Sequence, residues 1–427
     1  MIPDTHQAKA AYRLFDNPTV THPAIVDAHT QHTRSLLDVP GVTLLIEDST
    51  AISLPNRDAA SGLGPIGEDF TRGFWLHTTL AVRYEESSDR EKPDRLWPIG
   101  LAHQQAWTRP QKRPARRKST GRGKECNSAR QKRADRESIR WAVALASLPA
   151  RQQIDAQWIY VADRESDIYE VFGKCRDAAV SFVIRASHPR ALVDKQLGVD
   201  VTSATDVMSA VDAAPVRGDL QLELPQQGRI AKFEVRSTSI ELRGPPRPGG
   251  RLENFTLNVV RVREIDPPAG IEPLEWTLLT DLPIETLAMC ERVIRIYRVR
   301  WMIEELHKGM KTGLGLELSQ LSDYRRLSAL AGLVSVTAVR LLQMKWAART
   351  DGERPLNPQE KKEAMVMLLK KLHPPKDKAT TSWLWISIAK LGGYQGRKHD
   401  GPPGWLTLWR GWQTLQIMLR GFQLAGP

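Results

Sequence analysis

Residues 42–50 read VTLLIEDST, an apolar run rich in β-branched residues that stops at Asp48. Residues 158–163 read WIYVAD, a second apolar run, which stops at Asp163. Continuous apolar runs of this length, bounded by polar residues, are typical of strands buried on both faces of a sheet. The sequence therefore predicts two buried strands, each with an aspartate at its carboxyl end.

The rest of the chain divides by its hydrophobic patterning. Further strands are predicted at residues 74–82, 97–107 and 182–185, and helices at 137–148, 285–311 and 319–349. Between them, residues 190–283 are rich in Gly and Pro and alternate as in IAKFEVR at 230–236, which predicts a lobe of β-strands. Residues 356–381 read as a charged connector. A helical tail is predicted from the spacing of Trp405, Leu408, Trp409, Trp412, Leu415 and Leu419.

The composition narrows the choice of partner and compartment. A formal net charge of +12 favours a polyanion, nucleic acid ahead of a membrane. Much of this charge lies in residues 109–140, predicted to be a loop that either follows DNA phosphates or is simply solvated. The three scattered cysteines form neither a disulfide framework nor a zinc-ligand set, and no stretch approaches 18 uninterrupted apolar residues. We therefore expect a cytoplasmic protein with no membrane partner.

The predicted helix at 285–311 carries an unusual set of polar side chains. At 100° per residue, Tyr297, Arg300, Glu304 and Lys311 fall within about 60° of one another. One helical face would then offer a carboxylate, two cations and a phenol, which suits a metal ion held against a phosphate backbone. The ordinary alternatives are a glutamate paired with a neighbouring cation and a tyrosine in the core.

Three carboxylates are candidates for a metal site. Cutting a phosphodiester is assisted by two divalent cations about 3.5–4 Å apart, and Mg²⁺ prefers carboxylate oxygens, water and phosphate as ligands. Asp48, Asp163 and Glu304 supply such a set if the fold brings them together. A strand-end aspartate alone is more often a turn or cap residue. The order strand-Asp, strand-Asp, insertion, helix-Glu favours an α/β fold with a ribonuclease H-like core, a β-strand insertion and a helical C-terminal region.

These residues also carry a resemblance. The spacing Tyr297, Arg300, Glu304, Lys311 resembles the signature of the bacterial insertion-sequence DDE transposases of family four. The segments IEDST, VADRESDIY, FVIRASHPR and PLEWTLLTDLP are similar to segments of the same family. The resemblance implies four regions. They are a remnant of an N-terminal DNA-binding module (1–40), a ribonuclease H-like catalytic core (41–189 and 284–350), a β-strand insertion (190–283) and a helical dimerisation region (351–427).

The resemblance assigns roles residue by residue. It implies Asp48, Asp163 and Glu304 as catalytic ligands of two Mg²⁺ ions, for which Mn²⁺ can substitute. It implies that Trp276 stacks on a flipped base, although without the family it reads equally well as a core tryptophan. The other implied DNA contacts are Tyr297, Arg300, Lys311, Arg164, Arg185, Trp301 and Lys308.

The implied activity is cut-and-paste DNA transposition: strand nicking, hairpin formation and resolution, and strand transfer. Its partners would be double-stranded DNA, as transposon ends and target, and a second copy of the chain in a homodimeric synaptic complex, with no organic cofactor. The family's N-terminal module is longer than residues 1–40, so a second expectation is a shortened, non-catalytic inhibitor that forms mixed dimers. A general ribonuclease H-like nuclease is a third.

Overall fold

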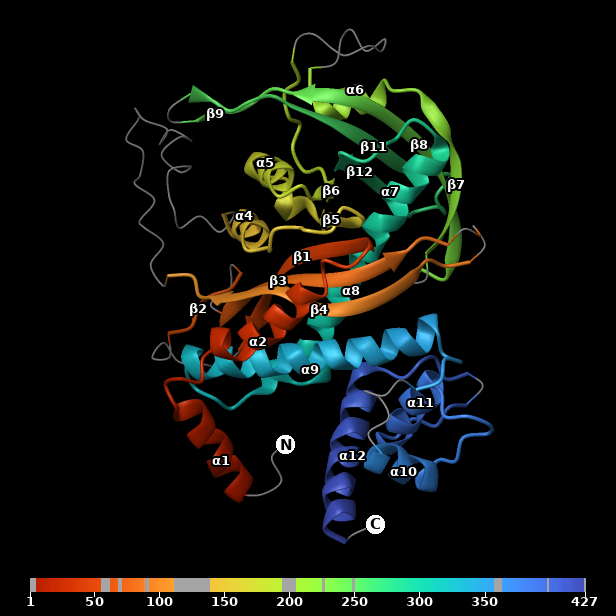
Figure 1. Cartoon of the computed structure of the whole chain (residues 1–427). Helices are drawn as coiled ribbons and strands as arrows, with labels where there is room; N and C mark the ends of the chain where they lie inside the picture. The colour runs from red at the N-terminus through yellow and green to blue at the C-terminus, as the bar shows by residue number, and fades with distance from the viewer. Residues whose placement is uncertain are drawn as a thin grey trace. The chain divides into compact units, whose positions relative to one another are not determined.

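The computed structural model describes residues 5–54, 62–67, 71–87, 89, 92–110, 139–193, 205–224, 227–247, 250–356, 363–397 and 399–425 (Figure 1). The chain forms two compact units, and each is built from separate segments. Unit 1 comprises Met1–Leu37, Ser49–Lys112 and Ile303–Pro427, and unit 2 comprises Asp38–Asp48 and Arg113–Met302.

Unit 2 is built on a mixed β-sheet. Its strand order is β1 (Gly41–Ser53), β5 (Ala156–Ala162), β6 (Ser181–Arg185), β12 (Glu275–Thr280), β11 (Phe255–Ile265), β8 (Arg229–Leu242) and β7 (Val216–Leu224). The first three strands are parallel and the rest are antiparallel. A separate two-stranded ribbon joins β9 (Pro246–Arg247) to β10 (Gly250–Arg251). The strands within 190–283 therefore extend the same sheet that begins with the parallel strands.

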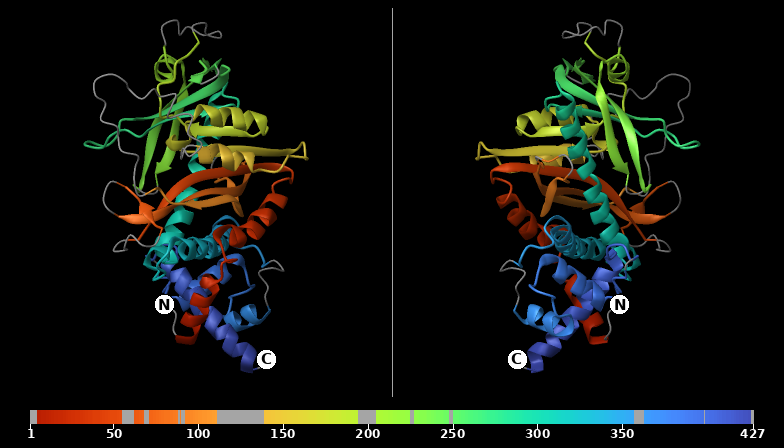
Figure 2. Two further views of the ribbon diagram at one scale, coloured as in Figure 1. Left: turned by 90° about the vertical axis from the view of Figure 1, so that its left-hand side faces the viewer. Right: turned by 90° about the vertical axis from the view of Figure 1, so that its right-hand side faces the viewer.

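Helices cover both faces of this sheet (Figure 2). The helices of unit 2 are α4 (Ile139–Ala146), η2 (Arg164–Ser166), α5 (Tyr169–Asp177), α6 (Val207–Asp212) and α7 (Leu287–Val299). On β6, Phe182 packs on Phe172 of α5, with ring centroids 5.4 Å apart, while Arg185 reaches Tyr297 of α7. Residues three apart on a strand point to opposite faces, so α5 and α7 lie on opposite sides of β6.

Unit 1 combines β-strands with helices. Its strands are β2 (Gly64–Pro65), β3 (Arg72–Glu85), β4 (Arg95–Trp107) and the end of β1, and its first helices are α1 (Thr5–Asp16) and α2 (His22–Ser35). The long helix α9 (Tyr324–Thr350) packs against α2 and β4. Among the described residues, α9 is the one helix long and apolar enough to cross a membrane by length and composition. Since 61% of its apolar window is buried, α9 has the character of a core helix.

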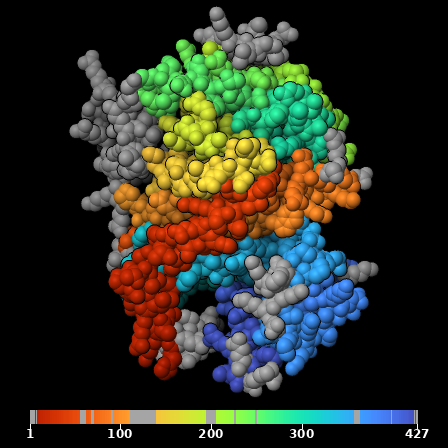
Figure 3. Space-filling model, viewed as in Figure 1, coloured from red at the N-terminus to blue at the C-terminus, as the bar shows by residue number. Residues whose placement is uncertain are grey.

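Three helices form the C-terminal part of unit 1, shown in blue in Figure 3: α10 (Glu363–Leu372), α11 (Thr381–Leu391) and α12 (Trp405–Ala425). A Cβ on Gly411 would collide with the carbonyl oxygen of Ile388, so α11 and α12 approach each other backbone to backbone. Leu369 of α10, Leu384 and Ile388 of α11 and Leu415 of α12 share one buried cluster.

The predicted fold class is confirmed: the chain is a mixed α/β protein with a large mixed sheet and a helical C-terminal region, consistent with a ribonuclease H-like core. One prediction was wrong, because the connector expected at 356–381 contains α10. Strand β1 also continues past Asp48, since Thr50 and Ile52 alternate as buried residues. Of the basic stretch 109–140, residues 111–138 lie outside the described residues.

The helix expected at 285–311 is divided. Helix α7 ends at Val299, Arg300 keeps right-handed helical backbone angles, and α8 (Trp301–Lys308) follows directly. A π-helical turn, η3 (Gly309–Gly313), then precedes a short 3-10 turn, η4 (Leu316–Leu318). The π turn breaks the regular helical period just before Lys311, so the simple helical-face calculation does not hold for that residue.

Candidate functional site

Asp48 and Asp163 lie at corresponding positions on neighbouring parallel strands. The registered pairs of β1 and β5 run to Glu47 and Ala162, and the two aspartates follow one residue later. Residues in register on parallel strands point to the same face, and neighbouring strands lie about 4.7–4.9 Å apart. Both aspartates are half-buried. Unit 2 therefore brings two predicted metal ligands side by side, as the apolar runs before them indicated.

The chain turns directly after Asp163. Its backbone is still extended, and its Oδ1 accepts a hydrogen bond of 2.9 Å from the backbone N–H of Glu165, which caps η2. This cap fixes the direction of the carboxylate and leaves the next residue, Arg164, exposed at the sheet edge. Asp163 thus acts as a helix cap, the ordinary role of a strand-end aspartate. The capping hydrogen bond uses one of its two carboxylate oxygens.

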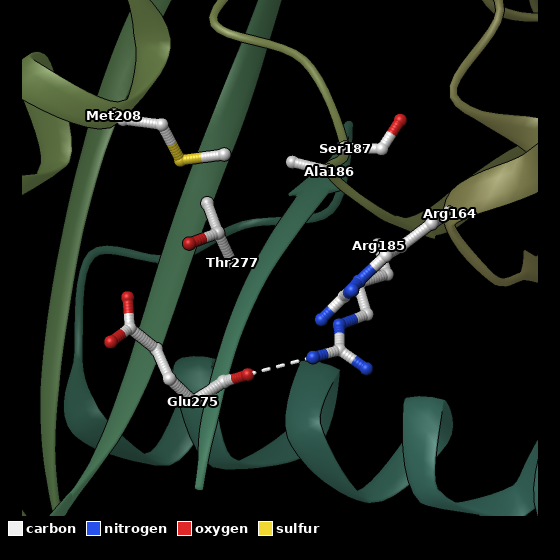
Figure 4. A pocket seen from close by; sticks show the side chains of 7 residues that line it. All are labelled: Arg164, Arg185, Ala186, Ser187, Met208, Glu275 and Thr277. Carbon is white, nitrogen blue, oxygen red and sulfur yellow. Dashed lines mark hydrogen bonds between the residues drawn. The ribbon is translucent and has the colours of Figure 1, made fainter. Parts of the chain in front are cut away.

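Arg185 continues the same row on the third strand. Ala162 of β5 pairs with Ile184 of β6, so Arg185 corresponds to Asp163 and points to the α7 face. Its guanidinium donates to the backbone oxygen of Glu275 over 2.9 Å (Figure 4). Asp48, Asp163 and Arg185 therefore lie in one line across β1, β5 and β6.

Positive charge is concentrated around Arg185. Burial lowers the pKa of Arg185 below its ordinary value; the phenol of Tyr297, which accepts a hydrogen bond from it, raises the pKa, and the cations Arg164 and Arg300 lower it. The guanidinium of Arg300 also lies 5.8 Å from the ring centroid of Tyr297. Unit 2 thus brings together four of the residues predicted to contact DNA. A phosphate would be stabilised by three neighbouring guanidinium groups.

Trp276 lies on the same face, next to this cluster. Its ring is stacked on Phe233, with centroids 6.2 Å apart and planes at 17°, and lies 5.8 Å from the ring of Tyr297. The indole is half-buried. Trp276 is therefore part of an aromatic row that supports Tyr297, which agrees with the alternative of a core tryptophan; its stacking on a flipped base stays a prediction.

A pocket of about 290 Å³ opens beside the arginines (Figure 4). Arg164 and Arg185 project into it from one side, and Met208 of α6 and Thr277 of β12 lie on the other. Its remaining lining residues are Ala186, Ser187 and Glu275. This arrangement pairs cationic groups with a partly apolar wall, which suits an anionic ligand that also has an apolar surface.

Asp167 holds the loop that forms one edge of this pocket. It is a buried residue, and its Oδ2 accepts hydrogen bonds from the backbone N–H groups of Ser187 (2.7 Å) and His188 (3.0 Å). Its Oδ1 accepts from Nε of Arg190 over 2.7 Å. From the sequence, Asp167 is either an acidic residue near the start of a helix, where it favours the helix dipole, or a residue that shapes the site indirectly. The long-range contacts to residues 187–190 favour the second role.

The remaining predicted site residues lie in α8 and in the π turn η3 that follows it. Trp301, the first residue of α8, is 41% exposed, and Glu304 and Lys308 are also exposed. Lys311 is half-buried within the π turn. Glu304, Lys308 and Lys311 belong to unit 1, whereas the two aspartates and the arginine cluster belong to unit 2.

The two aspartates match the ligand chemistry of Mg²⁺, because carboxylate oxygens are the donors it prefers. In the described part of the chain, no group of three or more His, Cys, Asp or Glu side chains is arranged to hold a metal ion. Carboxylates at one point repel one another unless a cation lies between them.

A mixed sheet with strand-end aspartates on adjacent parallel strands is consistent with the class of ribonuclease H-like proteins. Comparison with known families adds a second observation. Residues 335–426 match the family model described as the Transposase Tn5 dimerisation domain. The matched segment contains the second half of α9 and the helices α10, α11 and α12. The match supports a transposase-family protein that forms homodimers.

Proposed function

We propose that this chain is a DNA transposase that cuts and rejoins DNA in a Mg²⁺-dependent reaction through Asp48, Asp163 and Glu304. The observation that carries the proposal is the row formed by Asp48, Asp163 and Arg185, with Arg164 and Arg300 beside it. This row combines a pair of carboxylates for a cation with a cluster of cations for a phosphate. The dimerisation-domain match supports the same class of protein.

The roles of the residues follow from their chemistry. Asp48 and Asp163, together with Glu304, would hold Mg²⁺, or Mn²⁺ in its place, and two such ions would stabilise the charge that develops on phosphorus. Arg185 and Arg300 would bind the phosphate next to the cut, and Tyr297 would orient Arg185 through their hydrogen bond. Lys308, which is exposed, and Lys311, which is half-buried, would contact the DNA backbone.

The proposed reaction begins with hydrolysis. A water oxygen attacks phosphorus in line, the bond to the 3′-oxygen breaks, and that oxygen leaves as a 3′-hydroxyl while the new strand end keeps the phosphate. The 3′-hydroxyl then attacks a phosphorus of the opposite strand, where the bond to the flanking 3′-oxygen breaks and a hairpin forms. A second water attacks the hairpin phosphorus and displaces the 3′-oxygen, which becomes a hydroxyl again. This hydroxyl attacks a phosphorus of target DNA and releases the 3′-oxygen of the target strand. The substrate would be double-stranded DNA in the bacterial cytoplasm, in contact with the nucleoid, and the active form a homodimer.

The proposal is tested by comparing the parent chain with Asp163→Ala on a plasmid that carries the genomic DNA surrounding the coding sequence. We expect the parent to nick this DNA in Mg²⁺, and Asp163→Ala to lose cleavage while keeping measurable DNA binding. Asp155→Ala is the matched control, because Asp155 is an exposed aspartate at the other end of β5. Equal cleavage by Asp163→Ala and the parent would refute the assignment.

The same assay separates the other candidate functions. A shortened inhibitor would form mixed dimers with a full-length transposase and suppress its cleavage without cleaving DNA itself. A general ribonuclease H-like nuclease would cut RNA–DNA hybrids at least as well as duplex DNA.

A further inference from the structure

The π turn at Gly309–Gly313 accepts the side chain of Trp405, the first residue of α12. A Cβ added to Gly309 would lie 2.7 Å from Cε3 of Trp405, and one added to Gly313 would lie 2.8 Å from its Cβ. Real Cβ atoms do not approach other atoms so closely, so the indole fits only because both positions are glycine. These two glycines form a notch, and Trp405 fills it. The indole is buried, with 8% of its surface exposed.

Two further contacts brace the notch. Glu305 of α8 and Lys345 of α9 form an ion pair with side chains only 4% and 11% exposed, and Nζ of Lys345 lies 5.7 Å from the ring centroid of Trp405. Met310, inside the π turn, is fully buried, and its sulfur accepts a hydrogen bond from Oγ of Ser335. The turn is therefore held by α9 on one side and by α12 on the other.

This arrangement has local costs. A glycine within a helix is less favourable than alanine by about 0.5–1 kcal/mol, and η3 contains two of them. In the π turn, the usual helical hydrogen bond between residues four apart is replaced by one between residues five apart. The N–H of Leu314 donates to the backbone oxygen of Gly309 over 2.8 Å. Isolated π turns of this kind are frequent at functional sites.

The turn determines where Lys311 points. Each residue rotates a helix by 100°, so a hydrogen bond that spans one extra residue changes the direction of the side chains around it. Lys311 lies within the turn and is half-buried, while its neighbours Lys308 and Thr312 are exposed. Any change in the turn would therefore redirect the lysine proposed to contact DNA.

We propose that Trp405 is a positioning residue: by filling the notch of Gly309 and Gly313, it holds the π turn in the form that directs Lys311 toward a DNA phosphate. This inference rests on the proposed function for the DNA contact of Lys311. It extends the role of the matched dimerisation segment, since Trp405 and Lys345 both lie within residues 335–426. The segment that matches the dimerisation domain would then also shape the turn that carries Lys311.

The test measures how DNA binding depends on salt. Each lost phosphate contact reduces the slope of log K against log salt by about 0.9, which is roughly fourfold in affinity between 50 and 200 mM salt. We expect Trp405→Leu and Lys311→Ala each to reduce the slope by this amount, and the double variant to reduce it no further. Trp412→Leu is the matched control, because Trp412 lies on the same helix but packs against the Leu369–Leu415 cluster. It should leave the slope unchanged.

Hydrogen exchange provides a readout that needs no DNA. In Trp405→Leu, the amide of Leu314 should exchange at least tenfold faster than in the parent, while Trp412→Leu should not change it. Gly309→Ala disturbs the contact between the π turn and Trp405 by changing the turn and leaving the tryptophan in place. It should reduce the salt slope by the same amount, and it tests the positioning role if Trp405→Leu does not fold.

An unchanged slope in Trp405→Leu or Gly309→Ala, with a reduced slope in Lys311→Ala, would overturn the positioning role and leave Trp405 as a packing residue. Additive effects in the double variant would also overturn it. If Lys311→Ala itself leaves the slope unchanged, Lys311 makes no phosphate contact and the inference fails. Lack of Mg²⁺-dependent cleavage by the parent would instead refute the proposed function, because salt slopes report binding alone.

Discussion

Replacing Asp167 with alanine tests whether one buried carboxylate maintains the edge of the arginine pocket. The substitution removes the acceptor of the Ser187 and His188 backbone N–H groups and leaves Arg190 without its buried counter-charge. The Asp167 side chain is 0% exposed and that of Arg190 is 16% exposed. Solvent therefore cannot replace the lost interactions without rearrangement of the loop.

The expected magnitude follows from these contacts. Breaking a buried ion pair by removing one partner costs about 3–5 kcal/mol, because the remaining charge and donors stay desolvated. We take a cost of about 4 kcal/mol, and a tenfold change in an equilibrium constant corresponds to about 1.4 kcal/mol. The amide hydrogens of the loop should therefore exchange roughly a thousandfold faster than in the parent. Asp167→Asn keeps the size of the side chain but turns an amide group toward the same donors, so its effect should lie between alanine and the parent.

The assay is native-state hydrogen exchange at Ser187 and His188, whose N–H groups bond to Asp167 directly. Exchange is preferable to a single unfolding midpoint, because a chain of two units does not guarantee a two-state transition. Asp177→Ala is the control, because Asp177 pairs with Lys174 over 3.6 Å on the surface, with side chains 59% and 48% exposed. Its effect should stay below about 1 kcal/mol. If Asp167→Ala exchanges no faster at these amides than Asp177→Ala, the reasoning is wrong.

Two further predictions concern charge. Arg185→Gln should reduce the salt slope of DNA binding by about 0.9, because it removes one phosphate contact and keeps a hydrogen-bond donor near the oxygen of Glu275; an unchanged slope in a binding titration would contradict this role. The second prediction is a loss of thermal stability in acid. Burial lowers the pKa of three histidines of unit 1: His29 and His103 to about 4, and His307 to about 3. Their unfolded pKa is about 6.5, so below that pH the unfolded chain binds more protons. The stability they contribute is complete above pH 6.5 and is lost as the pH falls to about 4 for His29 and His103 and to about 3 for His307. A melting temperature that stays constant between pH 6.5 and 4.5 would contradict this.

The sequence predicted the parallel strands well, because their apolar runs carry the signal locally. VTLLIE and WIYVA are β-branched and aromatic stretches whose burial leaves few alternatives to inner strands, and the aspartates after them follow in register. The helix α10 was missed because its apolar residues Met365 and Leu369 lie among lysines and glutamates that resemble a solvated connector. The charge of the segment concealed the apolar stripe that packs into the core.

The site was predictable only where roles depend on neighbours in the chain. Tyr297 and Arg300 are one turn apart on a helix, so their shared face follows from spacing. The direction of Lys311 does not follow from spacing, because Lys311 lies in a π turn that packs against Trp405, a residue more than ninety positions later. The role of Asp167 depends in the same way on residues 187–190. Periodicity cannot report contacts between distant segments.

The two units alternate along the chain, and this limits how the protein can be divided into fragments. Strand β1 passes from unit 2 to unit 1 between Asp48 and Ser49, and α8 passes between Met302 and Ile303. Neither unit is therefore a contiguous piece of chain. A single protease nick cannot release either unit by itself, and a recombinant fragment limited to one unit would need its segments rejoined by new linkers.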